Sequence, residues 1–324
     1  MSRQSTRPGT VLVPLFAALS LGLTACGGGA GASAEEEGAA AAVRIGYFPL
    51  VHTATAVHAE EAGLFEAEDL DAELVQTAGG AAAIPALVSG DFDITYTNYT
   101  SALLAAEKGL PIRLVAGNDV GATDHGVFVA ADSGLEAPAD LAGRTVAVNN
   151  LQNIGTVAFY EHLEEAGLDP REVDLVEMPY PDMSAALERG EVDAVWQVEP
   201  FQAMAEQAGH RKIFDLFSGP VEEMPVAGWV TTQEFAEQNP ETVAAFERAI
   251  TASGEELQDD RERLVELVPT YTQVSAELTE QVEMPVFQGA LDLEKLQRTA
   301  DLMQRHGITG DRLEVSGLVA EPVR

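Results

Sequence analysis

Two segments of this 324-residue chain, placed 100 positions apart, carry the same pattern of residues. Ala-Leu-x-x-Gly-Asp-x-Asp at 86–93 recurs as Ala-Leu-x-x-Gly-Glu-x-Asp at 186–193. Glu-Ala-Gly-Leu at 61–64 recurs at 165–168, displaced by 104 positions. Each signal is common by itself, but the shared order and the nearly equal offsets indicate that the chain builds the same unit twice.

The hydrophobic pattern alternates between short strands and helices, and this alternation also starts twice. The strands that we expect are at 43–47, 71–76, 92–96 and 112–116 in the first run, and at 127–131, 145–148, 173–177, 192–196, 213–217 and 226–231 in the second. Beyond residue 232 the pattern is helical. Such alternation is typical of βαβ units, so it predicts an α/β fold with largely parallel sheets.

Two similar α/β units predict two lobes with a ligand cleft between them. We assign residues 43–125 and 225–324 to lobe 1 and residues 126–224 to lobe 2, so the chain crosses between the lobes twice. Small molecules bind beyond the carboxyl ends of parallel strands and between domains. Two linkers also allow the lobes to close on a ligand about a hinge.

The N-terminus has the features of an export signal. Arg3 and Arg7 precede an apolar run at 11–23, and this run is followed by Leu-Thr-Ala-Cys, which ends at Cys26. The run is too short for a comfortable membrane span. A charged start, an apolar middle and small residues before a cleavage site therefore assign residues 1–26 to a signal peptide.

Leu-Thr-Ala-Cys resembles the bacterial lipobox, in which the cysteine is lipidated and becomes the first residue of the mature protein. Cys26 is the only cysteine in the sequence, so no internal disulfide can form. Residues 27–42 are mainly Gly, Ala and Glu, which is typical of a flexible tether. We expect export and anchoring to the outer face of the cell membrane through lipidated Cys26 only. A plain secretory signal with an incidental cysteine is the alternative.

The acidic composition excludes one class of partner. The formal net charge is −35, and the chain contains three lysines. Because such a surface repels phosphate backbones, we exclude nucleic acid as a partner. The acidic residues are spread along the chain, which is typical of a solvated surface and says little about a ligand.

An ordered set of short motifs resembles the solute-binding proteins of ABC importers, in the group associated with nitrate, sulfonates, taurine and thiamine-pyrimidine precursors. No single motif is specific to this group, but the order in which the motifs occur across residues 43–308 is specific to it. The motifs are Val-Arg-Ile-Gly-Tyr at 43–47 with Pro49, Ala-Gly-Leu-Phe at 62–65 with Leu70, the repeats at 86–93 and 186–194, Asp-Leu-x-Gly-x-x-Val-Ala-Val at 140–148, and Glu-Pro-Phe at 199–201.

The resemblance implies a two-lobed type II periplasmic-binding-protein fold and a binding function. Such a protein captures a small polar organic solute or an oxyanion by hinge closure and delivers it to the permease and ATPase subunits of an importer. We therefore expect a monomer that is not an enzyme and that has no catalytic residues, no cofactor and no metal. Two alternatives stay open: a pyrimidine-synthesising or other enzyme on the same fold, and a sensory binding protein without a transport partner.

Polar and aromatic side chains gather where the expected strands end, and these are candidate ligand contacts. Aromatic rings stack on ligands, and imidazole and amide groups donate and accept hydrogen bonds. The candidates are Phe48, His52, Tyr96 and Asn98 in lobe 1, Asp124 and His125 at the first crossing, and Asn149, Asn150, Gln152, Asn153, Trp196 and Glu199 in lobe 2.

Several candidates also have a structural interpretation. Phe48 could pack on its own lobe, and Trp196 could belong to the core. Asp124 and His125 could simply pair with each other. One member of the amide cluster at 149–153 is expected to cap the following helix, but capping requires one residue rather than four. At least one of these amides is therefore expected to face the cleft.

The candidate turns contain no lysine or arginine, which argues against a strongly basic anion pocket. Helix N-termini and amides can still hold a sulfonate or nitrate without a formal positive charge. A neutral or cationic ring, such as an aminopyrimidine, would suit aromatic side chains together with Glu199 or Asp124. The sequence leaves the charge of the ligand open.

Overall fold

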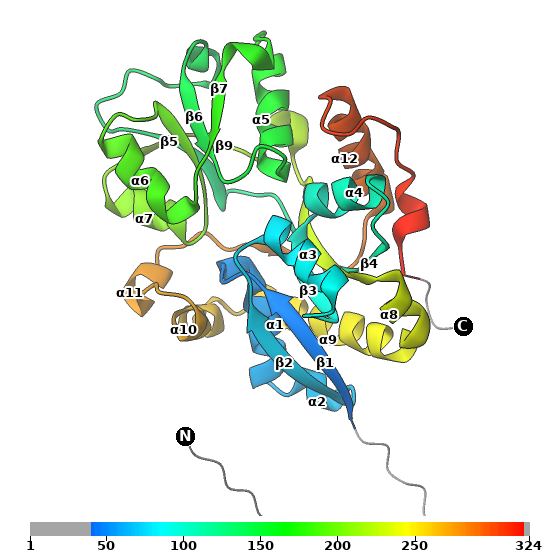
Figure 1. The fold of residues 1–324 in the computed structure, drawn as a ribbon. Coiled ribbons are helices and arrows are strands. Elements are labelled where there is room, and N and C mark those ends of the chain that lie inside the picture. The colour runs from blue at the N-terminus through cyan, green and yellow to red at the C-terminus, as the bar shows by residue number, and fades with distance from the viewer. Residues whose placement is uncertain (1–39, 321–324) are drawn as a thin grey trace, which may run out of the picture. The chain divides into compact units, whose positions relative to one another are not determined.

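The computed structural model describes residues 40–320, which belong to a single unit of the chain (Figure 1). The predicted signal peptide at 1–26, its Cys26 and most of the 27–42 tether lie outside the described residues. Among the residues that are described, no helix has the length and apolar character needed to cross a membrane.

The first sheet has six strands in the order β11-β4-β10-β3-β1-β2. β1 pairs in parallel with β2 and β3, whereas β10 runs antiparallel to β3 and β4, and β11 runs antiparallel to β4. The strands are β1 (Ala41–Tyr47), β2 (Leu70–Gln76), β3 (Ile94–Asn98), β4 (Ile112–Val120), β10 (Pro225–Thr232) and β11 (Val286–Phe287).

The second sheet has five strands in the order β7-β6-β8-β5-β9 and repeats the plan of the first. β6 pairs in parallel with β7 and β8, and β5 runs antiparallel to β8 and β9. β6 is therefore the counterpart of β1, and β5 is the counterpart of β10. The strands are β5 (His125–Val129), β6 (Thr145–Val148), β7 (Asp174–Glu177), β8 (Ala194–Val198) and β9 (Arg211–Asp215).

Both sheets are mixed, so the α/β class is confirmed but the prediction of largely parallel sheets is wrong. The parallel pairs come from the βαβ units around β1 and β6. β5 follows β4 of the first sheet, and β10 follows β9 of the second. Because no crossover helix within the same sheet precedes β5 or β10, these strands are free to enter antiparallel to their neighbours.

Helices surround the two sheets, and α12 packs beside α4 although they are far apart in sequence (Figure 1). The α-helices are α1 (Ala54–Glu61), α2 (Leu64–Ala67), α3 (Gly80–Ser89), α4 (Tyr99–Glu107), α5 (Ile154–Glu165), α6 (Tyr180–Glu188), α7 (Phe201–Gln207), α8 (Gln233–Gln238), α9 (Pro240–Gln258), α10 (Arg261–Tyr271), α11 (Ala276–Thr279) and α12 (Leu293–Arg305). Short 3₁₀ turns are η1 (Val51–Thr53), η2 (Pro138–Leu141), η3 (Pro170–Glu172), η4 (Gly219–Val221) and η5 (Val315–Leu318).

The longest of these helices, α9, supplies much of the core beneath the first sheet. Its apolar residues Phe246, Ile250 and Leu257 recur at helical spacing and are buried. The Phe246 ring stacks on Phe65 with 5.8 Å between centroids and meets the edge of Trp229 at 5.3 Å. Trp229 is therefore a core residue.

The last aspartate of the sequence repeat makes the same kind of hydrogen bond in both sheets. Asp93 Oδ2 accepts the backbone N–H of Arg44 at 2.8 Å, and Asp193 Oδ2 accepts the N–H of Thr145 at 2.9 Å. In both sheets a carboxylate that precedes one strand thus satisfies the backbone of the parallel strand beside it. The aspartate of each repeat is explained by this bond.

The chain passes between the two sheets twice. β4 ends at Val120 and β5 begins at His125, and on the return β9 ends at Asp215 and β10 begins at Pro225. β4 continues four residues beyond the expected strand at 112–116, because its last residues still pair with β10 and β11. This extension carries polar residues to the first crossing.

We expect Asp193→Ala to lower the free energy of unfolding by about 1–3 kcal/mol, because the Thr145 N–H then has no acceptor inside the fold. Urea denaturation monitored by circular dichroism measures this change. Asp132→Ala, at an exposed turn residue, is the control and should change the free energy of unfolding by less than about 0.5 kcal/mol. Equal stability of the two variants would show that the bond contributes nothing.

Candidate ligand-binding site

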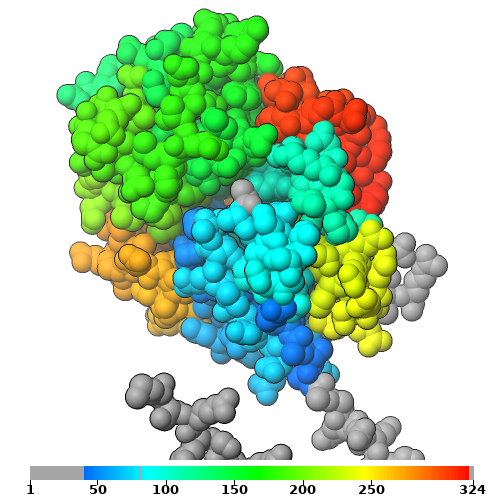
Figure 2. Space-filling view, viewed as in Figure 1, coloured from blue at the N-terminus to red at the C-terminus, as the bar shows by residue number. Residues whose placement is uncertain are grey.

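A cavity lies between the two sheets and is lined by residues from both. In the space-filling view the part of the chain that forms the second sheet, in green, lies against the part that forms the first, in blue and cyan (Figure 2). The lining consists of Phe48, Leu50, His52, Gly79, Tyr96, Asn98, Val226 and Ala227 from the first sheet and its loops, and His125, Asn149, Asn153, Ile154, Tyr180, Trp196 and Val198 from the second.

The cavity is small in this structure. Its volume is about 50 Å³, and one water molecule requires about 10–15 Å³ of such space. The cavity therefore holds a few water molecules as it stands. A larger solute requires the two sheets to move apart before it enters.

Most of the side chains that the sequence predicted as ligand contacts meet at this cavity. Strand ends explain the gathering, because the carboxyl ends of parallel strands meet at one edge of a sheet. The predicted residues that line it are Phe48, His52, Tyr96, Asn98, His125, Asn149, Asn153 and Trp196; those that do not are Asp124, Asn150, Gln152 and Glu199.

His52 is held by a buried carboxylate. Its Nε2 lies 2.6 Å from Asp124 Oδ2, and both side chains are almost completely buried. Burial by itself lowers the pKa of His52, but the negative charge of Asp119 and the bond to Asp124 outweigh this and raise the pKa above its ordinary value. The expected pairing of Asp124 with His125 is the weaker contact, since their atoms are 3.8 Å apart.

His125, at the start of β5, is buried between aromatic rings and the polar groups of His52, Asp119 and Asp124. Its ring stacks on Trp196 with 6.0 Å between centroids and meets the edge of Phe217 at 4.8 Å. Neither ring nitrogen has a hydrogen-bond partner among the described residues. Burial lowers the pKa of His125 to about 3, so the ring is neutral at pH 7.

Asp119 and Asn118 belong to the site although they were not among the candidates. Asp119 Oδ1 accepts the hydroxyl of Tyr96 at 3.2 Å and the amide of Asn118 at 2.8 Å. Burial raises the pKa of Asp119 to about 6. Both residues follow the expected strand at 112–116, just as the other candidates follow theirs, so the same rule could have included them. In the structure they belong to β4 itself, which continues to Val120.

Aromatic rings form one wall of the cavity. Tyr180, at the start of α6, meets the edge of Trp196 at 5.5 Å and stacks on Phe201. Tyr180 was not among the candidates, although it follows the expected strand at 173–177. Trp196 is buried in the middle of β8, so it belongs to the core and to the wall of the cavity at once.

The four amide residues in the turn before α5 have different roles. Asn153 is the N-cap of α5, and its Oδ1 accepts the N–H of Ile154 at 2.5 Å. Asn153 also donates its side-chain amide to Asn149 Oδ1, and both residues line the cavity. Asn150 instead accepts the backbone N–H of Gln152 at 2.8 Å, and Gln152 is exposed. Two of the four amides therefore reach the cavity.

Glu199 has a structural role next to the cavity. Its carboxylate accepts the N–H groups of Glu283 at 2.9 Å and Ala203 at 3.3 Å, and the amide of Gln202 at 3.3 Å. Burial raises the pKa of Glu199 to about 7 even though these donors oppose the shift. Glu199 thus ties α7 to the segment that precedes β11.

The charged groups around the cavity are acidic. Asp119, Asp124 and Glu199 are all buried nearby. Within the part of the chain that the structure describes, no lysine or arginine lines the cavity.

A larger hollow of about 680 Å³ lies elsewhere, between α5, η3 and α12. Glu164 and Arg305 line it and pair with each other at 3.2 Å. It does not gather the ends of strands from two sheets. For this reason we place the candidate site at the smaller cavity.

The fold is that of the periplasmic binding proteins, which confirms the predicted fold class. The crystal structure of the periplasmic aliphatic sulphonate-binding protein from Escherichia coli superimposes with a TM-score of 0.75 at 19% identity, over 86% of this chain and 97% of that one. The profile of the family described as NMT1/THI5 like matches residues 51–263. The chain therefore belongs to the NMT1/THI5-like family.

Two curated relatives are binding proteins by name. The taurine-binding periplasmic protein of Escherichia coli K12 is 26% identical over 171 residues, which cover 52% of either chain. The formylaminopyrimidine-binding protein of Halalkalibacterium halodurans is 27% identical over 211 residues, covering 64% of this chain and 63% of the relative. The chain thus spans about half to two thirds of the length of the relatives that it matches.

We expect Gly155→Ala to disturb the wall of the cavity. A Cβ atom at Gly155 would lie 2.3 Å from the Trp196 ring, so the indole must move. The free energy of unfolding should fall by about 1–3 kcal/mol, as for other overpacked cores, and the tryptophan emission maximum should shift. Gly134→Ala is the control, since its Cβ has no described heavy atom within 4 Å. Identical emission and stability in both variants would contradict this placement of Trp196.

Proposed function

We propose that this protein is an extracytoplasmic solute-binding protein that captures a small polar organic solute or an oxyanion and delivers it to an ABC importer. The observation that supports this most directly is the cavity, to which the strand ends of two similarly built sheets contribute amide, phenol and imidazole groups. It binds its solute without turnover. It acts as a monomer that meets the permease and ATPase subunits of its importer.

Hinge closure is the proposed mode of capture, with residues 43–125 and 225–324 as one lobe and residues 126–224 as the other. The two crossing segments run side by side: the Gly121 N–H donates to the Met224 carbonyl at 2.9 Å. Gly121 also lies against the Phe217 ring, which a Cβ there would approach to 2.0 Å. Two adjacent linkers form a compact axis about which the sheets can open and close.

The lining indicates what the solute must offer. Trp196 Nε1, a donor only, has no acceptor among the described residues, and His125 offers one donor and one acceptor in its neutral form. A suitable solute therefore carries acceptor atoms within a small polar frame. Taurine and formylaminopyrimidine, for which the two relatives are named, both meet this requirement.

The test is to identify the solute that purifies with the protein. Gently purified protein is denatured, the released small molecules are analysed by mass spectrometry, and a thermal-shift panel of taurine, an alkanesulfonate, nitrate and formylaminopyrimidine follows. A true ligand at 100 times its Kd adds about 2.7 kcal/mol to the free energy of unfolding. Conversion of a bound compound into product would instead establish an enzyme, and binding without any interaction with a permease would remove the transport role.

We expect Asn149→Ala to weaken solute binding about 3- to 10-fold, because a hydrogen bond to a neutral group contributes about 0.5–1.5 kcal/mol. Isothermal titration with the solute identified above measures the change. Gln152→Ala, in the same turn but exposed and outside the lining, is the matched control and should bind normally. Equal affinities of the two variants would place the solute away from this turn.

Membrane attachment through Cys26 is the second part of the proposal, and it rests on Leu-Thr-Ala-Cys at 23–26. In a bacterial host the full chain should fractionate with membranes and incorporate labelled fatty acid. We expect Cys26→Ser to remove the label and release the protein into the soluble extracytoplasmic fraction. A labelled, membrane-bound Cys26→Ser variant would show that another segment provides the anchor.

A further inference from the structure

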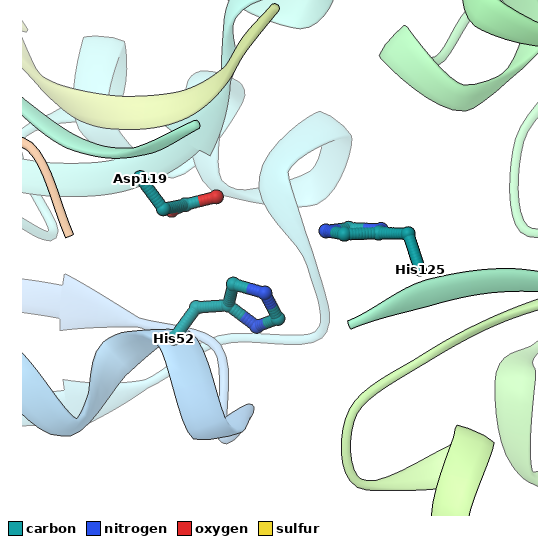
Figure 3. A group of neighbouring side chains, drawn as sticks. All are labelled: His52, Asp119 and His125. Carbon is teal, nitrogen blue, oxygen red and sulfur yellow. The ribbon is translucent and has the colours of Figure 1, made fainter. Parts of the chain in front are cut away.

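Three buried side chains converge on one point beside the cavity, and two of them, His52 and His125, also line it. His52 lies in η1, Asp119 near the end of β4 and His125 at the start of β5, and Figure 3 shows them pointing toward one another. One nitrogen or oxygen atom from each lies within 4.8 Å of the other two. Their exposed fractions are 1%, 2% and 2%. The point where they meet is therefore screened from bulk water.

Two of the three residues, His52 and Asp119, each use one polar atom in hydrogen bonds and have a second polar atom without a described partner. His52 Nε2 is bonded to Asp124, and its Nδ1 has no partner in the described part of the chain. Asp119 Oδ1 accepts from Tyr96 and Asn118, and its Oδ2 is likewise without a described partner. A histidine that binds a metal through one nitrogen commonly donates its other N–H to a carboxylate, as His52 can to Asp124.

His125 provides the third free group. Both of its ring nitrogens are buried without a partner among residues 40–320, and its ring is fixed by Trp196 and Phe217. Buried polar groups are normally hydrogen-bonded, and an orphaned group calls for an explanation such as an ion. Here three orphaned groups from three different segments share one location.

We propose that His52, Asp119 and His125 bind a divalent transition-metal ion, with Zn²⁺ as the best match, and leave one coordination position open toward the cavity. Two neutral imidazoles and one carboxylate are ligands that zinc favours. Three protein ligands with an open fourth position are typical of zinc sites that bind a further molecule. The sequence alone did not indicate a metal, because its ligands come from three separate segments.

Metal binding also connects the two sheets. Zn–ligand distances of about 2.0–2.2 Å place tetrahedral ligand atoms roughly 3.4 Å apart, and the three groups lie within 4.8 Å of one another, so metal binding draws them together by at most about 1.4 Å. His52 and Asp119 belong to the first sheet and its loops, and His125 belongs to the second. The ion therefore favours the arrangement in which the sheets are close together.

The role of the ion in solute capture rests on the proposed function. A divalent cation with one carboxylate and two neutral histidines as ligands keeps a charge of about +1 at the ion itself, which the Asp124 carboxylate behind His52 offsets in part. This supplies the positive charge that no lysine or arginine provides in the described lining. An oxygen or nitrogen donor of the solute takes the open position, which makes the ion part of the binding surface.

A second group, Glu161, Glu164 and His306, also brings potential ligands together but is already paired. Glu161 accepts from Arg305 and lies 2.5 Å from His306 Nε2. Arg305 supplies the opposite charge that an ion would otherwise provide. This group therefore serves as the internal control for zinc binding by a cluster of histidine and carboxylates whose charges are already paired.

The experiment uses the untagged full chain, freed of metal with a chelator and titrated with ZnCl₂ by calorimetry. We expect one zinc ion per chain and a characteristic visible spectrum when Co²⁺ replaces Zn²⁺. His125→Asn and Asp119→Asn should each weaken zinc binding at least about 100-fold, since loss of an outer-shell partner alone costs about 10- to 100-fold. His306→Asn should bind zinc like the unaltered protein. Melting temperatures of the metal-free variants verify that each is folded.

The outcomes separate this inference from the proposed function. Unchanged zinc affinity in folded His125→Asn and Asp119→Asn, or loss of binding in His306→Asn, overturns the site. Binding of a panel solute to metal-free protein that takes up no zinc overturns the site and retains the solute-binding role. Zinc uptake that depends on His125 and Asp119 supports the site even if no panel solute binds, and that second result counts against the proposed function.

Discussion

The buried polar network at the first crossing is the interaction on which the rest of the structure depends. The Asn118 amide donates to the His52 carbonyl at 3.0 Å and to Asp119, while its oxygen accepts from Trp229 at 3.0 Å and Thr55 at 2.6 Å. One side chain thus joins a loop, a helix and two strands. An amide buried this deeply is tolerated because its hydrogen-bonding capacity is used, and losing any partner would leave a costly orphan.

The same network places the candidate site where the two sheets meet. His52 reaches Asp124 across the end of β4, so the groups around the cavity belong to both sides of the crossing. Atoms of His52, Asp119, Asp124 and His125 that remain without described hydrogen-bond partners lie together at this junction. A site built in this way responds to any change in the spacing of the sheets, which is why solute, ion and closure are linked in our proposals.

The charge of the surface and the charge of the site have different origins. The acidic composition reflects carboxylates spread along the chain, many of them exposed. Asp119, Asp124 and Glu199 are instead buried, and burial raises the pKa of Asp119 to about 6 and that of Glu199 to about 7. Net charge therefore carries little information about the ligand, whereas the few buried acids next to the cavity constrain it strongly.

Sequence by itself determined the α/β class, the repetition of one unit, and the strands in or after which Phe48, Tyr96, Asn149 and Trp196 line the cavity. These follow from local periodicity and from the rule that parallel strands present their carboxyl ends at one edge. Only the tertiary structure decided the antiparallel entry of β5 and β10, the pairing of Asp124 with His52, and the meeting of Asp119 with both histidines. Most of those outcomes, such as the contacts of His52 with Asp119 and Asp124, join residues that are far apart in the sequence, and no local pattern encodes which distant side chain fills a buried partner's hydrogen bond.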